Sequence, residues 1–573
     1  MPPDKKTIRI PVLLLTLLVM AMPGNCHRSG PDDPDRFYLV LNKPFYVSGE
    51  TMWYKIYMLN RDAESRIVHI GLFNSAGKLL INQQLKVEHG AVSGSIDLPI
   101  EWPDDFYRLE ILSRWNLNFG PGGIQEKIIP VYNSSFPGQL PASFNEPEDT
   151  AIRKDSFRVS GNEFRVKFNK PLYHPRDSVV MEIDPLIRSG EYNLSVDVID
   201  LAQVPAAGKL GFNDYQEPSG KGRVQGNNDH SQFQPEKKLT LDAQVKEAAD
   251  SAPLTSSVLS VFIPSSHQLL RARAFHGSLH SDLPDLYGEQ VLQLLNLNPF
   301  QGKEPVVKME RIWDQVSLTI LIADRPLHTT EIDEYIIRAR LRRQVNEIFT
   351  GRELISSPSD TAYTRLPAAD MNFDMTHFKL IANLEDFIKS VVLTVRRQKE
   401  NDKTSIRLFN DQTEFLFMYH PWYLVDGLFS FEEPAILTTP FPDLRTVSFY
   451  TNKKSLNHFD PIMILYGIIS ITTNDSYWEN NILSYPNTIR YRGFYSGKSF
   501  IDSQPELGPG NQDTPDLRPS VYWNPNLLIP RGKKGVVKFR TTDNPGLFLV
   551  ELTGTDKSGS VVHQTALYRV AYP

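Results

Sequence analysis

The stretch FYLVLNKPFYVSGETMWYKIYML occupies residues 37–59, and its pattern indicates how the rest of the chain is organised. An apolar run ends at Asn-Lys-Pro in residues 42–44, the chain turns through Val-Ser-Gly in residues 47–49, and an aromatic-rich run resumes at Thr51. Apolar and aromatic runs on both sides of a proline-marked turn are typical of two β-strands. We therefore predict a strand on each side of this turn.

The same pattern returns as NKPLYHPRDS in residues 169–178. Asn, Lys, Pro, Tyr, an acidic residue and a hydroxyl residue recur at the same spacing in both stretches. A chance match of two prolines that follow lysines is the alternative, but six shared positions in ten favour a repeat. The sequence thus predicts two copies of one β-module.

The first copy is followed by GLFNSAGKLL, HGAVSGSIDLP, DDFYRLEIL and SRWNLNFG, in that order. This series resembles a macroglobulin-type domain, the β-sandwich repeated in α2-macroglobulin and in many cell-envelope proteins of Bacteroidetes. The resemblance implies a macroglobulin-like sandwich over residues 36–135 and a second macroglobulin-like region over residues 157–325. Residues 206–252 are polar and are expected to form a loosely held insertion in the second region. By position this insertion compares with the protease-sensitive bait segment of macroglobulins, although a surface loop is the favoured interpretation.

Length and composition set the broad class. A chain of 573 residues is too long for one hydrophobic core, so several domains are expected. With 40% hydrophobic residues, 22% charged residues and 42 prolines, it is typical of a folded protein rich in β-structure and loops. The net charge of -6 gives no electrostatic reason to expect nucleic acid as a partner.

The N-terminus indicates export. Three basic residues precede an apolar run in residues 12–22, which suits a signal-peptide core and is short for a membrane-spanning helix. The single cysteine, Cys26, follows this run, where a bacterial lipoprotein signal places the residue that is acylated. We therefore predict a lipoprotein signal peptide over residues 1–26, lipidation of Cys26, and an outer-membrane lipoprotein of the cell envelope on either the periplasmic or the surface face. A stray cysteine in a discarded signal peptide is the alternative.

One helix stands out between the β-rich regions. Residues 328–350 are expected to form a helical linker whose helix starts at Thr330, with acidic residues in its first turn and an apolar stripe along one side. Its four arginines are Arg338, Arg340, Arg342 and Arg343. They suggest either an anion-binding patch or a solvated helix face, and the solvated face is favoured.

Residues 375–475 have a different pattern. TSIRLFND, YLVDGLFS, DLRTVSFY and YGIISITTN occur in an order that resembles the plug domain of TonB-dependent outer-membrane receptors, which implies a small α+β domain. A receptor barrel needs about 22 strands of about ten residues, and only about a hundred residues follow Thr473. The plug-like domain is therefore expected to act as a soluble module or to meet a barrel made by another chain.

The tail, residues 517–573, reads as four strands and is expected to be a separate β-sandwich. The predicted fold class is thus mainly β, with several macroglobulin-like or immunoglobulin-like sandwiches and a small α+β plug-like domain.

No catalytic motif is evident. The sequence contains no HExxH, CxxC, GxxxxGK[ST] or GxSxG pattern. One cysteine excludes a disulfide framework, a thiolate zinc site and, for this sequence, the thioester of some macroglobulins. We therefore predict no catalytic, cofactor-binding or metal-binding residues. Four tryptophans could form a glycan or peptide platform, but sandwich cores are the favoured place for Trp53, Trp115, Trp422 and Trp523.

These observations favour a non-enzymatic envelope lipoprotein that binds a protein, peptide or glycan through its β-sandwich and plug-like modules. A second hypothesis is an accessory component of TonB-dependent uptake that partners an outer-membrane barrel protein. A third is a macroglobulin-like protease trap without a thioester, which predicts cleavage within residues 206–252 and retention of the protease.

Overall fold

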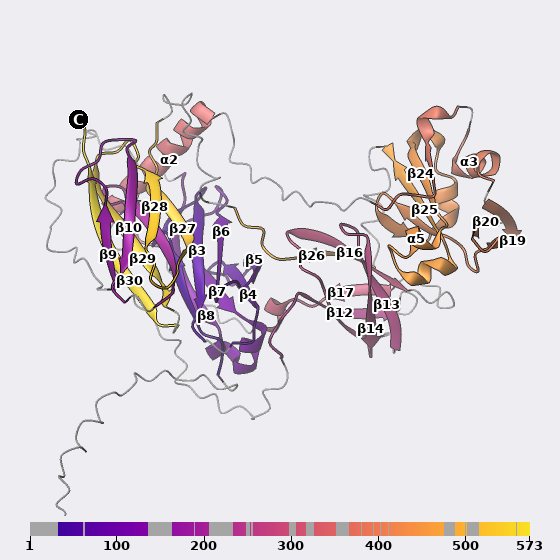
Figure 1. The fold of residues 1–573 in the computed structure, drawn as a ribbon, viewed down its shortest axis with the longest axis horizontal. Helices are drawn as coiled ribbons and strands as arrows, with labels where there is room; N and C mark the ends of the chain where they lie inside the picture. The colour runs from indigo at the N-terminus through magenta and orange to yellow at the C-terminus, as the bar shows by residue number, and fades with distance from the viewer. Residues whose placement is uncertain are drawn as a thin grey trace, which may run out of the picture.

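The computed structural model describes residues 33–60, 63–135, 163–187, 190–204, 233–247, 253, 256–296, 305–316, 326–350, 366–379, 381–393, 395–400, 403–410, 412–474, 487–498, 500, 515–556 and 559–573. These residues form four β-sheet modules, which Figure 1 shows as two neighbouring sandwiches, a central sheet and a separate α+β module. The mainly β fold class predicted from the sequence is confirmed. No helix of the described residues is both long and apolar enough to cross a membrane.

The first sandwich packs a three-stranded sheet, β1-β3-β6, on a five-stranded sheet, β2-β8-β7-β4-β5. The strands are β1 (Phe37–Leu41), β2 (Tyr46–Val47), β3 (Thr51–Met58), β4 (Ile67–Phe73), β5 (Leu79–Lys86), β6 (Ala91–Asp97), β7 (Asp105–Leu112) and β8 (Gln125–Tyr132), and the 3-10 helix η1 (Arg114–Gly123) joins the last two. Inward side chains such as Ile56, Leu72 and Leu109 are fully buried between the sheets. The strands predicted on each side of the 42–49 turn are β1 and β3.

The second sandwich is built from two distant parts of the chain. Its sheets are β28-β10-β9 and β27-β11-β29-β30. The strands are β9 (Phe164–Phe168), β10 (Ser178–Pro185), β11 (Tyr192–Asp200), β27 (Ser520–Ile529), β28 (Gly535–Arg540), β29 (Gly546–Asp556) and β30 (Val561–Val570). Val179 and Leu194 share one core with Val537 and Val550. The expectation that residues 517–573 form a separate sandwich is therefore wrong, because these strands complete the sheets that β10 and β11 begin.

A seven-stranded sheet follows, in the order β17-β12-β15-β14-β13-β16-β26. Its strands are β12 (Thr240–Glu247), β13 (Ser256–Ile263), β14 (Gln268–Phe275), β15 (Ser278–Asp282), β16 (Glu289–Asn296), β17 (Pro305–Met309) and β26 (Thr488–Arg492), with the 3-10 helix η2 (Ile312–Gln315) after β17. The prediction of a single macroglobulin-like region over residues 157–325 is wrong, because its strands divide between the second sandwich and this seven-stranded sheet. The expectation of a loosely held insertion over residues 206–252 is wrong for the part that forms β12, where alternate residues Leu241, Ala243 and Val245 are buried.

The α+β module lies over residues 371–473 and contains the five-stranded sheet β18-β24-β25-β22-β23 and the three-stranded sheet β19-β20-β21. Its strands are β18 (Met371–Asp374), β19 (Val395–Glu400), β20 (Lys403–Asn410), β21 (Phe415–Leu416), β22 (Trp422–Val425), β23 (Leu428–Ser430), β24 (Leu444–Tyr450) and β25 (Ile468–Thr473). Its helices are α3 (Leu384–Val391), α4 (Glu433–Leu437), α5 (Lys453–Leu456), η3 (Met375–His377), η4 (Phe441–Asp443) and η5 (Pro461–Leu465). The Asn383 side chain caps α3 by accepting from the Asp386 N–H (2.9 Å).

The modules are nested in the chain. The seven-stranded sheet lies between β11 and β27 of the second sandwich, and the α+β module lies between β17 and β26 of that sheet. Strand β26 returns to pair with β16. In Figure 1 the α+β module consequently sits at the end of the molecule farthest from the second sandwich.

The two sandwiches are fastened to each other by buried polar contacts. The Lys55 ammonium on β3 donates to Asn193 Oδ1 on β11 (2.5 Å) and to the Pro525 carbonyl, and the Tyr57 hydroxyl donates to the Thr553 carbonyl (2.9 Å). Burial lowers the pKa of Lys55 to about 7. These side chains replace water as hydrogen-bond partners at the interface between the two sandwiches, so the interface is held by direct hydrogen bonds.

Candidate functional site

The repeated turn has the same hydrogen bonds in both sandwiches. The bonds are Lys43 to Glu50 and Tyr46 to Asn42 in the first copy (2.6 and 2.7 Å), and Lys170 to Asp177 and Tyr173 to Asn169 in the second (2.8 and 2.7 Å). In each copy the acidic side chain also accepts from a backbone N–H of the turn, at 2.9 and 3.0 Å. The predicted repeat of one β-module is confirmed at the level of individual side chains.

Helix α2 (Thr330–Thr350) covers the first copy of this turn, and its bounds agree with the helix predicted from Thr330. Its buried residues Ile332, Tyr335 and Ile336 pack in one cluster with side chains from both sandwiches, among them Phe45 and Leu549. The helix therefore fills the junction between the two sandwiches near their shared end (Figure 1).

The centre of this junction is charged. The Tyr335 hydroxyl donates to Glu50 Oε1 (2.7 Å) and accepts from the Lys43 ammonium (3.0 Å), and an Arg342 nitrogen lies 3.6 Å from Glu50 Oε1. Burial lowers the pKa of Lys43, although Glu50 opposes that effect. Burial would raise the pKa of Glu50, but Lys43 and Arg342 outweigh it, so the pKa of Glu50 is lowered. Glu50 thus keeps its charge in the junction, where two cations neutralise it.

The arginines of α2 do not form a solvated face, contrary to the favoured interpretation of the sequence. Their bonds are Arg338 to the Ala202 carbonyl (3.0 Å), Arg340 to the Ser134 carbonyl (3.1 Å), Arg342 to Gln203 Oε1 (2.8 Å) and Arg343 to the Ser134 hydroxyl (3.3 Å). All four acceptors lie just after the C-terminal end of a sandwich strand, either β8 or β11. The arginines consequently fasten α2 to both sandwiches.

His328, just before α2, links the helix to the first sandwich. Its Nδ1 lies 2.6 Å from Asp333 Oδ1 in the first turn of α2, and its Nε2 lies 3.2 Å from Asp104 Oδ2. Burial alone would lower the pKa of His328, but the hydrogen bonds and charges of the two carboxylates outweigh it and raise the pKa above 6.5.

This arrangement predicts a pH-dependent fastening of α2. Because the folded pKa of His328 is raised, its stabilisation is complete below pH 6.5 and is lost as the pH rises through the folded pKa. The expected loss is about 0.5–1.5 kcal/mol, the size of a typical hydrogen bond. Hydrogen exchange of the α2 amides, corrected for the intrinsic rate, should accelerate over that pH range in the native protein and show no such step in His328→Asn. An identical pH profile in the variant would contradict the prediction.

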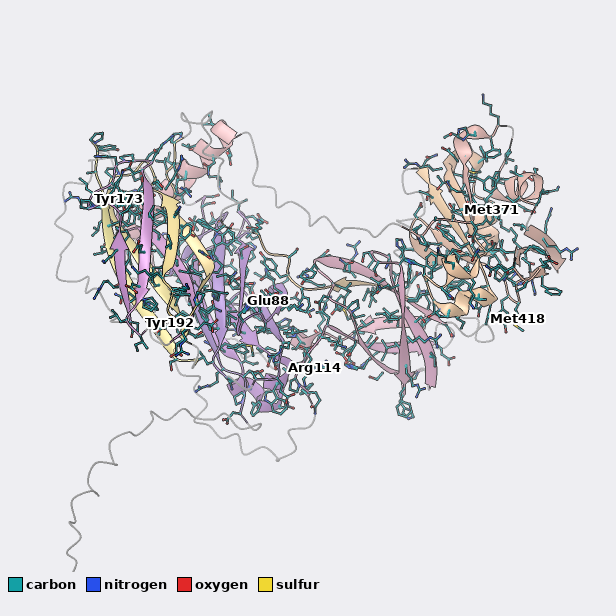
Figure 2. The ribbon with its side chains drawn as sticks, viewed as in Figure 1. Glu88, Arg114, Tyr173, Tyr192, Met371 and Met418 are labelled. Carbon is teal, nitrogen blue, oxygen red and sulfur yellow. The ribbon has the colours of Figure 1, made fainter. Side chains whose placement is uncertain are left out.

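A cavity of about 380 Å³ lies between the first sandwich and the seven-stranded sheet. Strands β4 and β5 line one wall, and residues of β12, β17, η2 and β26 line the other. Figure 2 places Arg114 on the side of the first sandwich that faces the sheet. A volume of this size is within the range of small-molecule and peptide side-chain sites.

A chain of ion pairs crosses one side of the cavity. The buried His69 Nε2 lies 2.5 Å from Glu236 Oε2, and Arg114 lies 2.5 Å from Asp242 Oδ2 and 3.9 Å from Glu236 Oε1. His280 Nδ1 lies 2.6 Å from the other oxygen of Asp242. Burial would raise the pKa of Asp242, but hydrogen bonds from His280 and Arg114 outweigh it, so the pKa is lowered. These groups therefore satisfy one another and hold the two walls together.

Among the other charged groups that line the cavity, Arg492 pairs with Glu289 (3.0 Å) and Glu310 accepts from Gln244 (3.2 Å). Arg311 and Arg490 line it, and within the described part of the chain neither guanidinium has an ion-pair partner. Among the same residues, no hydroxyl or thiol is hydrogen bonded to His69 or His280, and no group of His, Cys, Asp and Glu is arranged to hold a metal ion. The chemistry on offer is thus recognition of a polar, anionic group by guanidinium forks.

Sequence reasoning missed this cavity. His69, Arg114, Glu236 and Asp242 come from three separate segments, and although Arg114 lies in SRWNLNFG, no motif links these segments to one another. Cys26, the one site residue predicted from the sequence, lies outside the described residues. The favoured core positions of the tryptophans are confirmed for the buried Trp53, Trp422 and Trp523, whereas Trp115 is half-buried and donates to the Asp33 carbonyl (3.0 Å).

Strand pairing thus defines the chain as a set of β-sandwich and sheet modules, two of which contain the same turn. No protein-family model matches the chain, and no curated protein matches it. Solved structures similar to it include Salmonella α2-macroglobulin reacted with methylamine (10% identity, 94% of this chain, 40% of that chain, TM-score 0.25). They also include Escherichia coli α2-macroglobulin in its native conformation (10% identity, 95% and 40%, TM-score 0.25) and activated by porcine elastase (9%, 94% and 44%, TM-score 0.24).

The chain therefore spans about two fifths of the length of these bacterial α2-macroglobulins. TM-scores near 0.25 are too low to carry an argument, so the sandwich assignment rests on the strand pairing described above.

Proposed function

We propose that this chain is a non-enzymatic binding protein of the cell envelope that holds a carboxylate-bearing peptide or glycan in the cavity between the first sandwich and the seven-stranded sheet. The observation that carries the proposal is that two guanidinium groups, Arg311 and Arg490, have no ion-pair partner among the described residues and lie beside walls that are already held together by their own ion pairs. Amide side chains Asn82 and Gln315 also line the cavity and suit hydroxyl or peptide groups.

The test uses two probes, trigalacturonic acid and triglutamate, titrated into the full chain by calorimetry. One probe is expected to bind, and Arg311→Ala/Arg490→Ala is expected to weaken it about 10²- to 10⁴-fold, because each of the two lost charged hydrogen bonds contributes about 1.5–3 kcal/mol. Arg531→Ala, which removes an exposed arginine far along the chain in the second sandwich, is the matched control and should leave binding unchanged. Equal binding by the double variant, or no binding of either probe, would contradict the proposal.

The envelope location rests on the N-terminal sequence. We propose that Cys26 is acylated after removal of the preceding signal peptide and anchors the chain in the outer membrane. Intact-mass analysis of the native protein should show a mass increase for the lipid, and Cys26→Ala should lack it and move to the soluble fraction. A native protein of unmodified mass in the soluble fraction would refute the anchor.

One observation favours the uptake-accessory alternative as a second function. The plug-like module carries exposed apolar side chains at Phe415 (75%) and Met418 (63%), both next to the three-stranded sheet β19-β20-β21. A barrel protein is a partner that such a surface would fit. Co-purification of a barrel protein with the native chain, and its loss in Phe415→Ser/Met418→Ser, would support this function, whereas a monodisperse monomer in mild detergent would count against it.

The protease-trap alternative places its cleavage within residues 206–252, a range that strand β12 partly occupies.

A further inference from the structure

The two copies of the turn share their backbone geometry as well as their side-chain bonds. Gly49 and Arg176 occupy equivalent positions, and both have left-handed backbone conformations, with φ of 89° and 63°. In each copy the tyrosine of the turn pairs in parallel with a valine of the final strand, Tyr46 with Val131 and Tyr173 with Val570. The second turn is therefore a preformed copy of a surface whose occupant is known in the first.

The two copies differ in what covers them. The side chain of Lys43 is 4% exposed and that of Lys170 is 44% exposed. The apolar residue after the proline follows the same trend, because Phe45 is 5% exposed and Leu172 is 43% exposed. Figure 2 shows Tyr173 at the outer end of the second sandwich, opposite the end that carries Tyr192. The second turn thus presents an open ion pair beside an exposed apolar side chain.

The first copy shows which chemistry suits this surface. Helix α2 supplies a hydroxyl, Tyr335, that bonds both members of the ion pair, and a guanidinium, Arg342, that lies on the same helix face beside the carboxylate. Two turns of helix separate Tyr335 from Arg342. The same ring packs against Phe45 at 5.0 Å between centroids. A tyrosine and a basic residue two turns apart, with apolar neighbours, therefore match the turn.

We propose that the second turn, formed by residues 169–177, is a docking site for an amphipathic helix of a partner protein that carries a tyrosine and an arginine two turns apart on one face. Asp177 accepts from the partner's hydroxyl and guanidinium, Lys170 donates to the same hydroxyl, and Leu172 contacts its apolar face. The guanidinium of Arg176 is already held by both oxygens of Asp543 (2.5 and 2.8 Å), so it does not compete for Asp177. This surface is distinct from the cavity, and the inference goes beyond the proposed function.

The test uses a stapled helical peptide with the sequence of residues 329–349 as the probe and the full chain as the receptor. Saturable binding is expected by fluorescence anisotropy. Asp177→Asn should weaken it about tenfold, because the amide keeps the acceptor for the turn's backbone N–H but loses the charge. Glu182→Gln, an exposed acid on β10 of the same sandwich, is the matched control and should bind like the native chain.

A second pair of probes separates this site from displacement of α2 itself. Peptides with Tyr335→Phe or Arg342→Ala should bind the native chain more weakly than the parent peptide does. When the receptor is the Asp177→Asn variant, the altered peptides and the parent peptide should bind with similar affinity. Absence of saturable binding would overturn the proposal. Binding that Asp177→Asn leaves unchanged would also overturn it, because the peptide would then occupy another surface.

Discussion

Replacement of Glu50 by alanine is expected to destabilise the paired sandwiches by about 3–5 kcal/mol, because removal of one partner leaves a buried charge uncompensated. The ammonium of Lys43 would lose its 2.6 Å contact, and the Tyr335 hydroxyl and Arg342 would lose the same carboxylate. Helix α2 should then detach from the junction. A fall in the unfolding midpoint in denaturant, together with faster hydrogen exchange along α2, is the expected result.

The second module supplies the control for this experiment. Asp177→Ala removes the equivalent carboxylate from the same turn, but its ion pair with Lys170 is much more exposed than the Lys43–Glu50 pair. Exposed ion pairs contribute about 0–1 kcal/mol, so this variant should lose little stability. Equal losses in the two variants would show that the burial of the first pair under α2 does not determine its contribution. Because the chain has several modules, each transition must be assigned by exchange data before the midpoints are compared.

The second large effect is expected at Gln293 of β16, which connects the seven-stranded sheet to the α+β module. Its fully buried side chain donates to the Phe429 carbonyl (2.7 Å) and accepts from the Phe429 N–H (2.9 Å), as a neighbouring strand would. The Phe429 ring also lies 4.6 Å from the Phe262 ring of the sheet. Gln293→Ala leaves both backbone groups buried without partners, which costs about 2–6 kcal/mol at about 1–3 kcal/mol for each group.

The expected signature is local. Hydrogen exchange should increase in β22 and β23, and proteases should release the α+β module, while the sandwiches keep their stability. Gln290→Ala changes the same residue type on the same strand, where the side chain donates to the Tyr287 carbonyl (2.7 Å) and not to the α+β module. That control should leave the exchange of β23 unchanged. Normal protection of β23 in Gln293→Ala would show that Phe262 and its apolar neighbours suffice to dock the module.

The parts of the fold that depend on neighbouring residues were predictable. The turn at residues 42–50 has its network within a few positions of the chain, so its repeat could be recognised from spacing alone. Helix α2 and the cap at Asn383 also follow from local patterns. Strand β12 was missed because the polar composition of the residues around it dominated the interpretation, although its own residues alternate with period two.

The parts that depend on distant pairing were not predictable. Strand β11 lies between β27 and β29, which come much later in the chain, and nothing in a single strand specifies so distant a partner. The candidate site has the same origin, because its walls come from different modules. For the arginines of α2, only the folded structure shows that carbonyl and side-chain oxygens beyond β8 and β11 come within their reach.

The nested order of the modules also sets a sequence of events during synthesis. The first sandwich is complete when β8 has emerged, whereas β11 waits for β27 through about 320 further residues. At about 5–20 residues per second this interval is roughly 15–60 s. The α+β module is complete first among the nested parts, the seven-stranded sheet closes when β26 arrives, and the second sandwich closes last. During that interval β9, β10 and β11 have unpaired edges, so a nascent chain is most exposed to aggregation while its innermost module is being made.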